Sequence, residues 1–253
     1  GAKLLLPVHR GNEQRLAAAG EKLNKQIDRT TERLGYGSFE DWYLRCQAWD
    51  CQSYRPEGMA QHERIFTPML EEVFVPLELD LSGNHPGFKT AGMQLPIKEL
   101  EQIQELNIWH FIRQAEQQRP FRQLAILAWG GYGKTTLLKH IAYIYSTQQQ
   151  GQDRYRVPMR LPVLLFLRKY RDLLAKDNPP DLPTLMTQQH IPNLPKEGDE
   201  RTVPDNWATN LLRQGKANVM LDGFDEVAKA QRPAVARWIN KQMRRYGNSI
   251  FIV

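Results

Sequence analysis

The strongest constraint on the fold is a short stretch in the middle of the chain, where an apolar run breaks into glycines. Residues 124–136 read Leu-Ala-Ile-Leu-Ala-Trp-Gly-Gly-Tyr-Gly-Lys-Thr-Thr. The pattern predicts a buried strand that ends near Trp129 and a helix that begins near Lys134. Glycines at such a junction let backbone N–H groups converge on an anion, because no Cβ blocks the positive φ angles required. The helix N-terminus adds its partial positive charge.

This stretch is close to the GxxxxGK[ST] phosphate-binding loop. In that motif the lysine reaches the β- and γ-phosphates of a nucleoside triphosphate and the next hydroxyl ligates Mg²⁺, which gives these roles to Lys134 and Thr135. Ala128 stands where the motif has its first glycine. On this stretch alone, a glycine-rich turn before an ordinary helix is the alternative. The predicted nucleotide-binding residues are Gly130, Gly131, Tyr132, Gly133, Lys134, Thr135 and Thr136.

A second segment further along the chain supports the nucleotide interpretation. Residues 217–227 read Ala-Asn-Val-Met-Leu-Asp-Gly-Phe-Asp-Glu-Val, an apolar strand that delivers an acid at its end, as a Walker B element does. Asp222 is predicted to hold Mg²⁺, directly or through water, because hard cations take oxygen ligands. Asp225 and Glu226 follow closely enough to position or deprotonate an attacking water. A strand before an acidic turn is common in isolation, but both elements in this order favour a nucleotide site.

The composition is that of an ordinary soluble protein, with 41% hydrophobic and 25% charged residues in 253. No apolar run reaches the roughly 20 residues that cross a bilayer, and the apolar stretch at 3–7 is too short for a signal peptide. Cys46 and Cys51 would face different ways on a helix, and no histidine cluster accompanies them. We therefore expect reduced thiols, no zinc site and a cytoplasmic location, with any membrane association coming from regions outside this chain.

The net charge of +6 raises the question of nucleic acid. Basic residues are scattered, with local clusters at 154–160, 168–171 and 244–245, and none shows the signature of a nucleic-acid-binding motif. A solvated basic face explains this pattern better than a nucleic-acid site does. Acidic partners and a membrane surface stay open as alternatives.

The chain divides into a helical part and an alternating part. Helices are predicted over 12–34, 39–51 and 60–72, followed by an exposed, mobile loop at 81–95 and a long helix over 96–118. From Phe121 onward strands alternate with helices, which is typical of a parallel sheet covered by helices on both faces. The predicted strands are 124–128, 162–167, 217–222 and 249–253, and the predicted helices are 134–148, 182–189, 205–214 and 233–246.

Four passages resemble the NACHT domain, a branch of the STAND class of AAA+ P-loop NTPases. They are Phe-Val-Pro-Leu at 74–77, the loop at 128–136, the strand at 161–168 that Arg168 closes, and Leu-Asp-Gly-Phe-Asp-Glu at 221–226. The last passage, with a small residue after the first acid and paired acids beyond, is fairly specific to the family. The phosphate loop is shared by many NTPases.

The resemblance implies an α/β fold with a parallel sheet flanked by helices, preceded by an N-terminal helical region over 1–72. The NACHT-type domain would cover 73–253. It would be truncated at its C-terminal end, because the family continues with a Thr-Ser-Arg sensor, a winged helix and a repeat array. The resemblance also favours ATP and ADP over GTP as ligands, together with Mg²⁺. It implies that residues 74–77 lie near the base, in a signalling protein like the bacterial NLR-like proteins.

The function implied is an ATP-dependent switch that controls assembly or signalling. Lys134, Asp225 and Glu226 would be catalytic, and Thr136 would contact the α-phosphate. Loss of a single arginine can slow phosphoryl transfer by about 10³-fold or more, so without the sensor we expect slow hydrolysis or none. One alternative is a non-hydrolytic scaffold whose helices over 12–72 bind a partner protein or a second copy of the chain. A nucleic-acid motor is a third and less supported reading.

Overall fold

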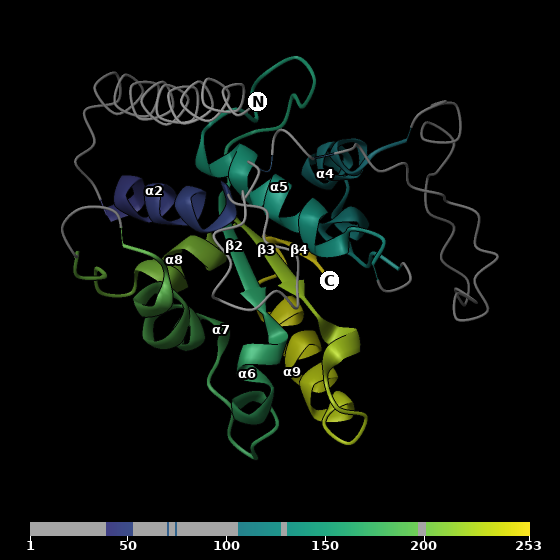
Figure 1. The fold of residues 1–253 in the computed structure, drawn as a ribbon, viewed down its shortest axis with the longest axis vertical. Coiled ribbons are helices and arrows are strands. Elements are labelled where there is room, and N and C mark those ends of the chain that lie inside the picture. Colours follow the sequence, from purple (N-terminus) through teal and green to yellow (C-terminus); the bar gives the residue numbers. More distant parts are fainter. Residues whose placement is uncertain (1–38, 53–69, 71–73, 75–105, 128–130, 197–200) are drawn as a thin grey trace, which may run out of the picture.

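The computed structural model describes residues 39–52, 70, 74, 106–127, 131–196 and 201–253 (Figure 1). Its centre is a four-stranded sheet in the order β1-β4-β3-β2, and every neighbouring pair is parallel. The strands are β1 (Gln123–Leu124), β2 (Leu161–Phe166), β3 (Ala217–Asp222) and β4 (Ile250–Ile252). The predicted parallel sheet is therefore confirmed. The connections place the carboxyl ends of β2 and β3 side by side, with Phe166 opposite Asp222.

Helices surround this sheet. They are α2 (Phe39–Gln52), α4 (Ile108–Gln117), α5 (Lys134–Ser146), α6 (Leu167–Leu174), α7 (Leu182–Leu185), α8 (Trp207–Arg213) and α9 (Arg232–Arg245). Four short turns complete the described elements: η1 (Arg119–Arg122), η2 (Met186–His190), η3 (Ile191–Asn193) and η4 (Phe224–Glu226). The helix predicted over 182–189 is thus a single turn of α-helix that continues as the π-turn η2. In the described residues, no helix combines the length and the apolar character needed to cross a membrane.

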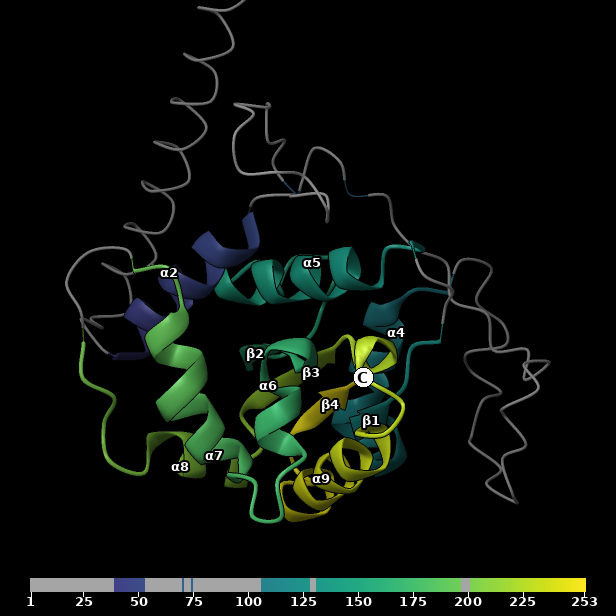
Figure 2. The same ribbon diagram turned by 60° about the horizontal axis from the view of Figure 1, so that its bottom comes forward.

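The two faces of the sheet carry separate hydrophobic clusters because side chains alternate along each strand. Val163, Val219 and Phe251 pack with residues of α6, α7, α8 and α9. Leu164, Met220 and their neighbours on β4 pack with α4 and α5. Figure 2 shows α5 on one side of the sheet and α6 and α9 on the other. The prediction of a parallel sheet with helices on both faces is therefore confirmed.

Helix α2 covers the outer edge of β2. Tyr43 of α2 is fully buried, and its hydroxyl donates a hydrogen bond to the carbonyl of Pro162 at 2.8 Å. An uncovered edge strand exposes unpaired carbonyls, and α2 satisfies one of them. α2 thus shares the core of the sheet, although it precedes the alternating part of the sequence. The division of the chain at residue 73 stays a prediction.

Both cysteines of α2 are buried, and neither forms a disulfide. Cys46 packs in the cluster with β2, and Cys51 packs in the cluster with α5, so they point toward different parts of the core. The prediction of two thiols that face different ways is confirmed.

Strand β1 differs from its prediction. A buried strand over 124–128 was expected, but the assigned strand is Gln123–Leu124 and the side chain of Leu127 is 55% exposed. Backbone pairing does continue, since Ile126 N donates to the carbonyl of Val253 at 2.8 Å. Among the described strands β1 pairs with β4 alone, and its side chains alternate because successive residues point to opposite faces, with Leu124 and Ile126 packed against the core. Residues 128–130 lie outside the described residues.

Helix α4 also differs. One helix was expected over 96–118, but α4 begins at Ile108 because Asn107 is extended (φ −127°, ψ 170°). Trp109 N donates to the Asn107 side chain at 3.1 Å, and Asn107 N donates to His110 Nδ1 at 3.2 Å. This reciprocal capping box satisfies N–H groups that an uncapped helix start leaves unpaired. The expected helices over 12–34 and 60–72, and the loop at 81–95, fall outside the described residues except for Leu70, which is helical.

His190 makes the stability of the domain depend on pH. It is buried with its Nε2 3.3 Å from the Tyr43 hydroxyl, and burial, followed by the charge of Lys169, lowers its pKa from 6.5 to about 3. The unfolded chain therefore takes up this proton near pH 6.5, whereas the folded chain does not, so stability falls as the pH drops below 6.5. Between pH 7 and pH 5 this group should cost about 2 kcal/mol of unfolding free energy.

Chemical denaturation at both pH values measures this loss. The His190→Gln variant keeps an amide that can hydrogen-bond the tyrosine but does not titrate, so its unfolding free energy should change less between the two pH values. An equal change in both proteins would contradict the assignment. The comparison is needed because His140, whose pKa burial lowers to about 4, adds a slope of the same sign.

Candidate functional site

The glycine loop leads directly into α5. Gly131 (φ 85°) and Gly133 (φ 76°) both adopt left-handed backbone conformations, and Gly133 is the N-cap of α5. Gly133 has no side chain to cap the helix, and the first helical bond runs from Leu137 N to its carbonyl at 2.8 Å. The N–H groups of the first turn of α5 are therefore offered to an external acceptor, as at an anion site. Gly130 lies outside the described residues.

The loop is open on its outer side. A Cβ added to Gly131 would meet no atom of the described residues within 4 Å, and the side chain of Tyr132 is 65% exposed. There is room for a ligand beside the main chain of this loop. If Tyr132 binds a phosphate, it would do so through its backbone N–H rather than its ring.

Thr135 and Asp222 meet at the junction of α5 and β3. The Thr135 hydroxyl donates to Asp222 Oδ2 at 2.7 Å, and Asp222, the last residue of β3, is 6% exposed. Among the described residues, no group of three or more His, Cys, Asp or Glu side chains gathers to hold a metal by itself. A hydroxyl and a carboxylate side by side suit a hard cation such as Mg²⁺, which completes its shell with water and substrate phosphates.

Lys134 points at the acidic turn. Its Nζ lies 3.1 Å from Asp225 Oδ2, with the lysine side chain 21% exposed and the aspartate 58% exposed. The first residue of α5 and the turn after β3 are therefore linked by an ion pair across the mouth of the loop. Thr136 lies in the same turn of α5 and is partly buried.

Glu226 is paired with an arginine from a third element. Arg168 Nη1 donates to Glu226 Oε2 at 3.3 Å, and both side chains are about two-fifths exposed. Arg168 is the second residue of α6, directly beyond the end of β2, and β2 neighbours β3. From the sequence, Arg168 could be recognised only as the residue that closes the second strand, because its partner Glu226 lies far along the chain.

The acidic turn has its own supports. Gly223 (φ 80°, ψ 30°) starts η4 in a left-handed conformation, which explains the small residue after Asp222. Arg232, at the start of α9, donates to the carbonyls of Asp225 at 2.6 Å and Val227 at 2.8 Å. Sequence reasoning missed Arg232. It bonds to main-chain atoms, so no motif of side chains marks it.

The segment at 74–77 is described only at Phe74. Its ring stacks on His140 of α5, with ring centroids 3.7 Å apart and nearly parallel planes. Phe74 therefore packs on the helix that carries the glycine loop at its start. Residues 75–77 lie outside the described residues.

The chemistry of these groups suits a phosphate ester that is bound together with a divalent cation. It combines an open anion cradle, a lysine, a hydroxyl–carboxylate pair and two further acids. The family model of the NACHT domain matches residues 122–252, just over half of the chain. The chain belongs to the NACHT family. NACHT domains are nucleotide-binding P-loop NTPases, and the matched range contains the whole sheet and all the predicted site residues.

The NACHT match begins after α2 and α4, although both helices pack against its sheet. Comparison with curated proteins and with solved structures found no match to this chain. The family assignment thus rests on the NACHT model together with the fold and the order of the strands.

Proposed function

We propose that this NACHT domain binds ATP with Mg²⁺, hydrolyses it slowly and uses its nucleotide state as a signalling switch. The observation that carries the proposal is the meeting of Thr135 and Asp222 at 2.7 Å beside the open glycine loop. A metal-binding pair next to an anion cradle is what a Mg-nucleotide requires. We further infer a cytoplasmic location, since neither cysteine forms a disulfide.

Each residue takes one role in this proposal. The main chain of residues 130–136 surrounds the phosphates, and Lys134 leaves Asp225 to bind the β- and γ-phosphates. Thr135 and Asp222 hold Mg²⁺, which when bound neutralises charge on the phosphate oxygens. Asp225 and Glu226 orient the attacking water, and one of them accepts its proton.

Two ion pairs support slow hydrolysis. Asp225 is paired with Lys134, and Glu226 is paired with Arg168. Phosphoryl transfer depends almost wholly on positioning and charge, so a water cannot be activated until these acids are placed for it. ATP binding is expected to release Asp225 by taking its lysine, and hydrolysis stays slow because Glu226 must also leave Arg168 before it can accept a proton.

Isothermal titration calorimetry on the folded chain tests the proposal. We expect one equivalent of Mg-ATP or Mg-ADP to bind, Mg-GTP to bind more weakly, and removal of Mg²⁺ by EDTA to weaken ATP binding. Folded protein that gives no heat with either adenine nucleotide would refute the proposed site. ATP binding that EDTA does not weaken would refute the roles of Thr135 and Asp222 as Mg²⁺ ligands. It would not contradict phosphate binding by the glycine loop.

The second candidate is a scaffold that binds nucleotide without hydrolysing it. One observation favours it: Trp49 on α2 is 51% exposed, although the opposite side of the helix is buried in the core. An exposed tryptophan on a firmly anchored helix is a frequent anchor for a protein partner. Under this reading the two acids would serve only to hold the loop in place.

A further inference from the structure

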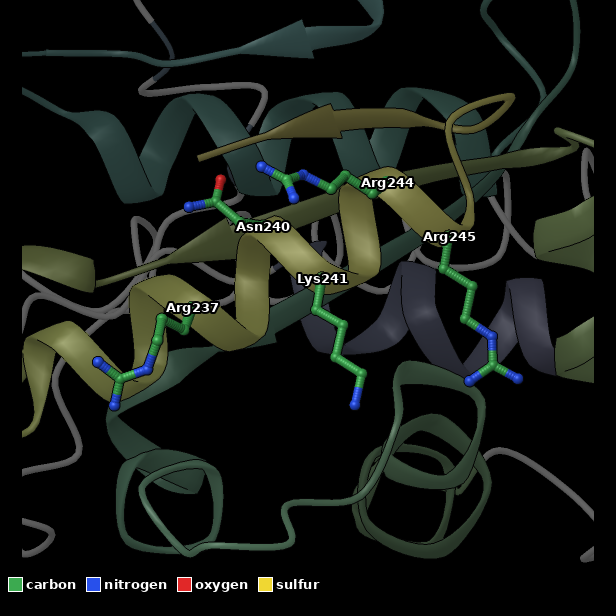
Figure 3. Close-up of a pocket in the computed structure, with 5 residues that line it drawn as sticks. All are labelled: Arg237, Asn240, Lys241, Arg244 and Arg245. Carbon is green, nitrogen blue, oxygen red and sulfur yellow. The ribbon is translucent and has the colours of Figure 1, made fainter.

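The outer face of α9 carries a concentration of positive charge. Arg237, Asn240, Lys241, Arg244 and Arg245 line a shallow cavity of about 570 Å³ along this helix (Figure 3). The five residues recur three or four positions apart, so they share one side of the helix. All five are exposed, and none of them is acidic.

The inner face of α9 packs in the core and so fixes where the helix lies. This packing does not account for the positive charge on the outer face of the helix. Val235, Trp238 and Ile239 are buried in the core, and the Trp238 indole donates to the carbonyl of Pro180 at 2.7 Å. Gln242 is also buried and accepts a hydrogen bond from Leu182 N at 3.0 Å. The helix is therefore held rigidly from behind. Its basic side chains extend from the opposite, exposed side of the helix.

One of the cations already binds a carboxylate. Arg245 Nη1 donates to Asp181 Oδ2 at 3.1 Å. Arg237, Lys241 and Arg244 make no ion pair with any residue that the structure describes. Like charges at this spacing repel one another, so the face favours an occupant that supplies negative charge.

We propose that this face of α9 is a docking surface for an acidic segment of a partner protein. From Arg237 to Arg244 the helix rises about 10 Å, and carboxylates on alternate residues of an extended segment recur roughly every 7 Å, which lets neighbouring acids reach neighbouring cations. The contact between Arg245 and Asp181 is an example of the same recognition within the chain. The proposal does not depend on nucleotide binding.

Nucleic acid fits this surface less well. Single-stranded nucleic acid is usually held by a basic groove together with aromatic side chains on which bases stack. Of the described residues, no aromatic one lines the cavity, and the lining residues all belong to one helix. The amide of Asn240, between the cations, can donate to a main-chain carbonyl or to a carboxylate of a peptide.

Fluorescence anisotropy with the full chain tests the proposal. The probe is a fluorescein-labelled peptide of alternating glutamate and serine, titrated at low and at physiological salt without nucleotide. We expect binding that weakens with salt and that falls about tenfold in Arg237→Glu/Lys241→Glu, because each exposed pair contributes a factor of up to about five. The neutral variant Arg237→Gln/Lys241→Gln should lose less affinity for the peptide. It keeps the test valid if the charge-reversed variant does not fold.

The matched control is Arg154→Glu/Arg156→Glu, which makes the same change in net charge on exposed residues away from α9. It should leave peptide affinity within about twofold. Equal losses in the two reversed proteins would overturn the proposal, because they would show a response to total charge alone. It is overturned equally if the peptide does not bind, or if single-stranded DNA or phosphatidylserine vesicles bind through Arg237 and Lys241 more tightly than the peptide.

Discussion

Replacement of Lys134 by alanine is expected to weaken Mg-ATP binding about 100-fold. The lysine stands at the first position of α5, and its Nζ is directed across the loop mouth toward Asp225. In the proposed complex it exchanges this aspartate for phosphate oxygens. A hydrogen bond to a charged group contributes about 1.5–3 kcal/mol, and the upper part of that range corresponds to the expected loss.

Calorimetry with Mg-ATP and Mg-ADP measures the change. Lys139→Ala is the matched control, because it removes the same charge from the same helix one turn beyond the loop. Its affinity should stay within about threefold of the unchanged protein. If Lys134→Ala binds ATP as tightly as Lys139→Ala does, the lysine has no phosphate contact and the proposed loop is wrong. The variant should fold normally, since the aspartate it leaves unpaired is 58% exposed.

Replacement of Glu226 by glutamine is expected to slow ATP hydrolysis by about 10²–10⁴-fold, the usual contribution of a general base, while ATP affinity changes little. Glutamine keeps the shape and can still accept the hydrogen bond from Arg168, but it cannot take a proton from water. The loss would therefore lie in the chemical step and not in binding. Single-turnover phosphate release with protein in excess suits a slow enzyme.

Asp225→Asn, measured in the same way, shows which of the two acids acts as the base, because the larger loss identifies it. Asp153→Asn, an exposed acid paired with Arg156 and far along the chain from the acidic turn, controls for the change in charge. Phosphate release that is equally fast in both turn variants and the control would rule out both acids. It would leave the non-hydrolytic scaffold as the better description.

The parts of the fold that could be predicted are those with local causes. The start of α5 at Lys134 and the end of β3 at Asp222 were predicted at the observed residues, and β2 lies within one residue of its predicted bounds. In each case the signal lies within a few residues: glycines with positive φ, or a run of apolar side chains long enough for a buried strand. The roles of the site residues in binding and catalysis stay predictions.

The failures have non-local causes. Whether β1 is buried depends on which elements pack against it, and its position beside β4 in the described sheet is a property of strand order. The start of α4 at Ile108 was a local miss, since Asn107 is a recognisable N-cap that the apolar periodicity of the longer segment obscured. The packing of α2 against β2 could not be inferred, because aromatic residues on one helix face indicate that the face is buried but not which element it packs against.

The sequence by itself determined the glycine loop, the acidic turn and the alternation of strands and helices. Backbone conformation and apolar periodicity depend on residues that are close together in the sequence. Only the tertiary structure decided that Lys134 pairs with Asp225, that Arg168 pairs with Glu226, and that Arg232 holds the turn between them. These pairs join residues from separate elements. Their contacts follow from the order and register of the parallel strands, which bring the ends of β2 and β3 together beside the start of α5.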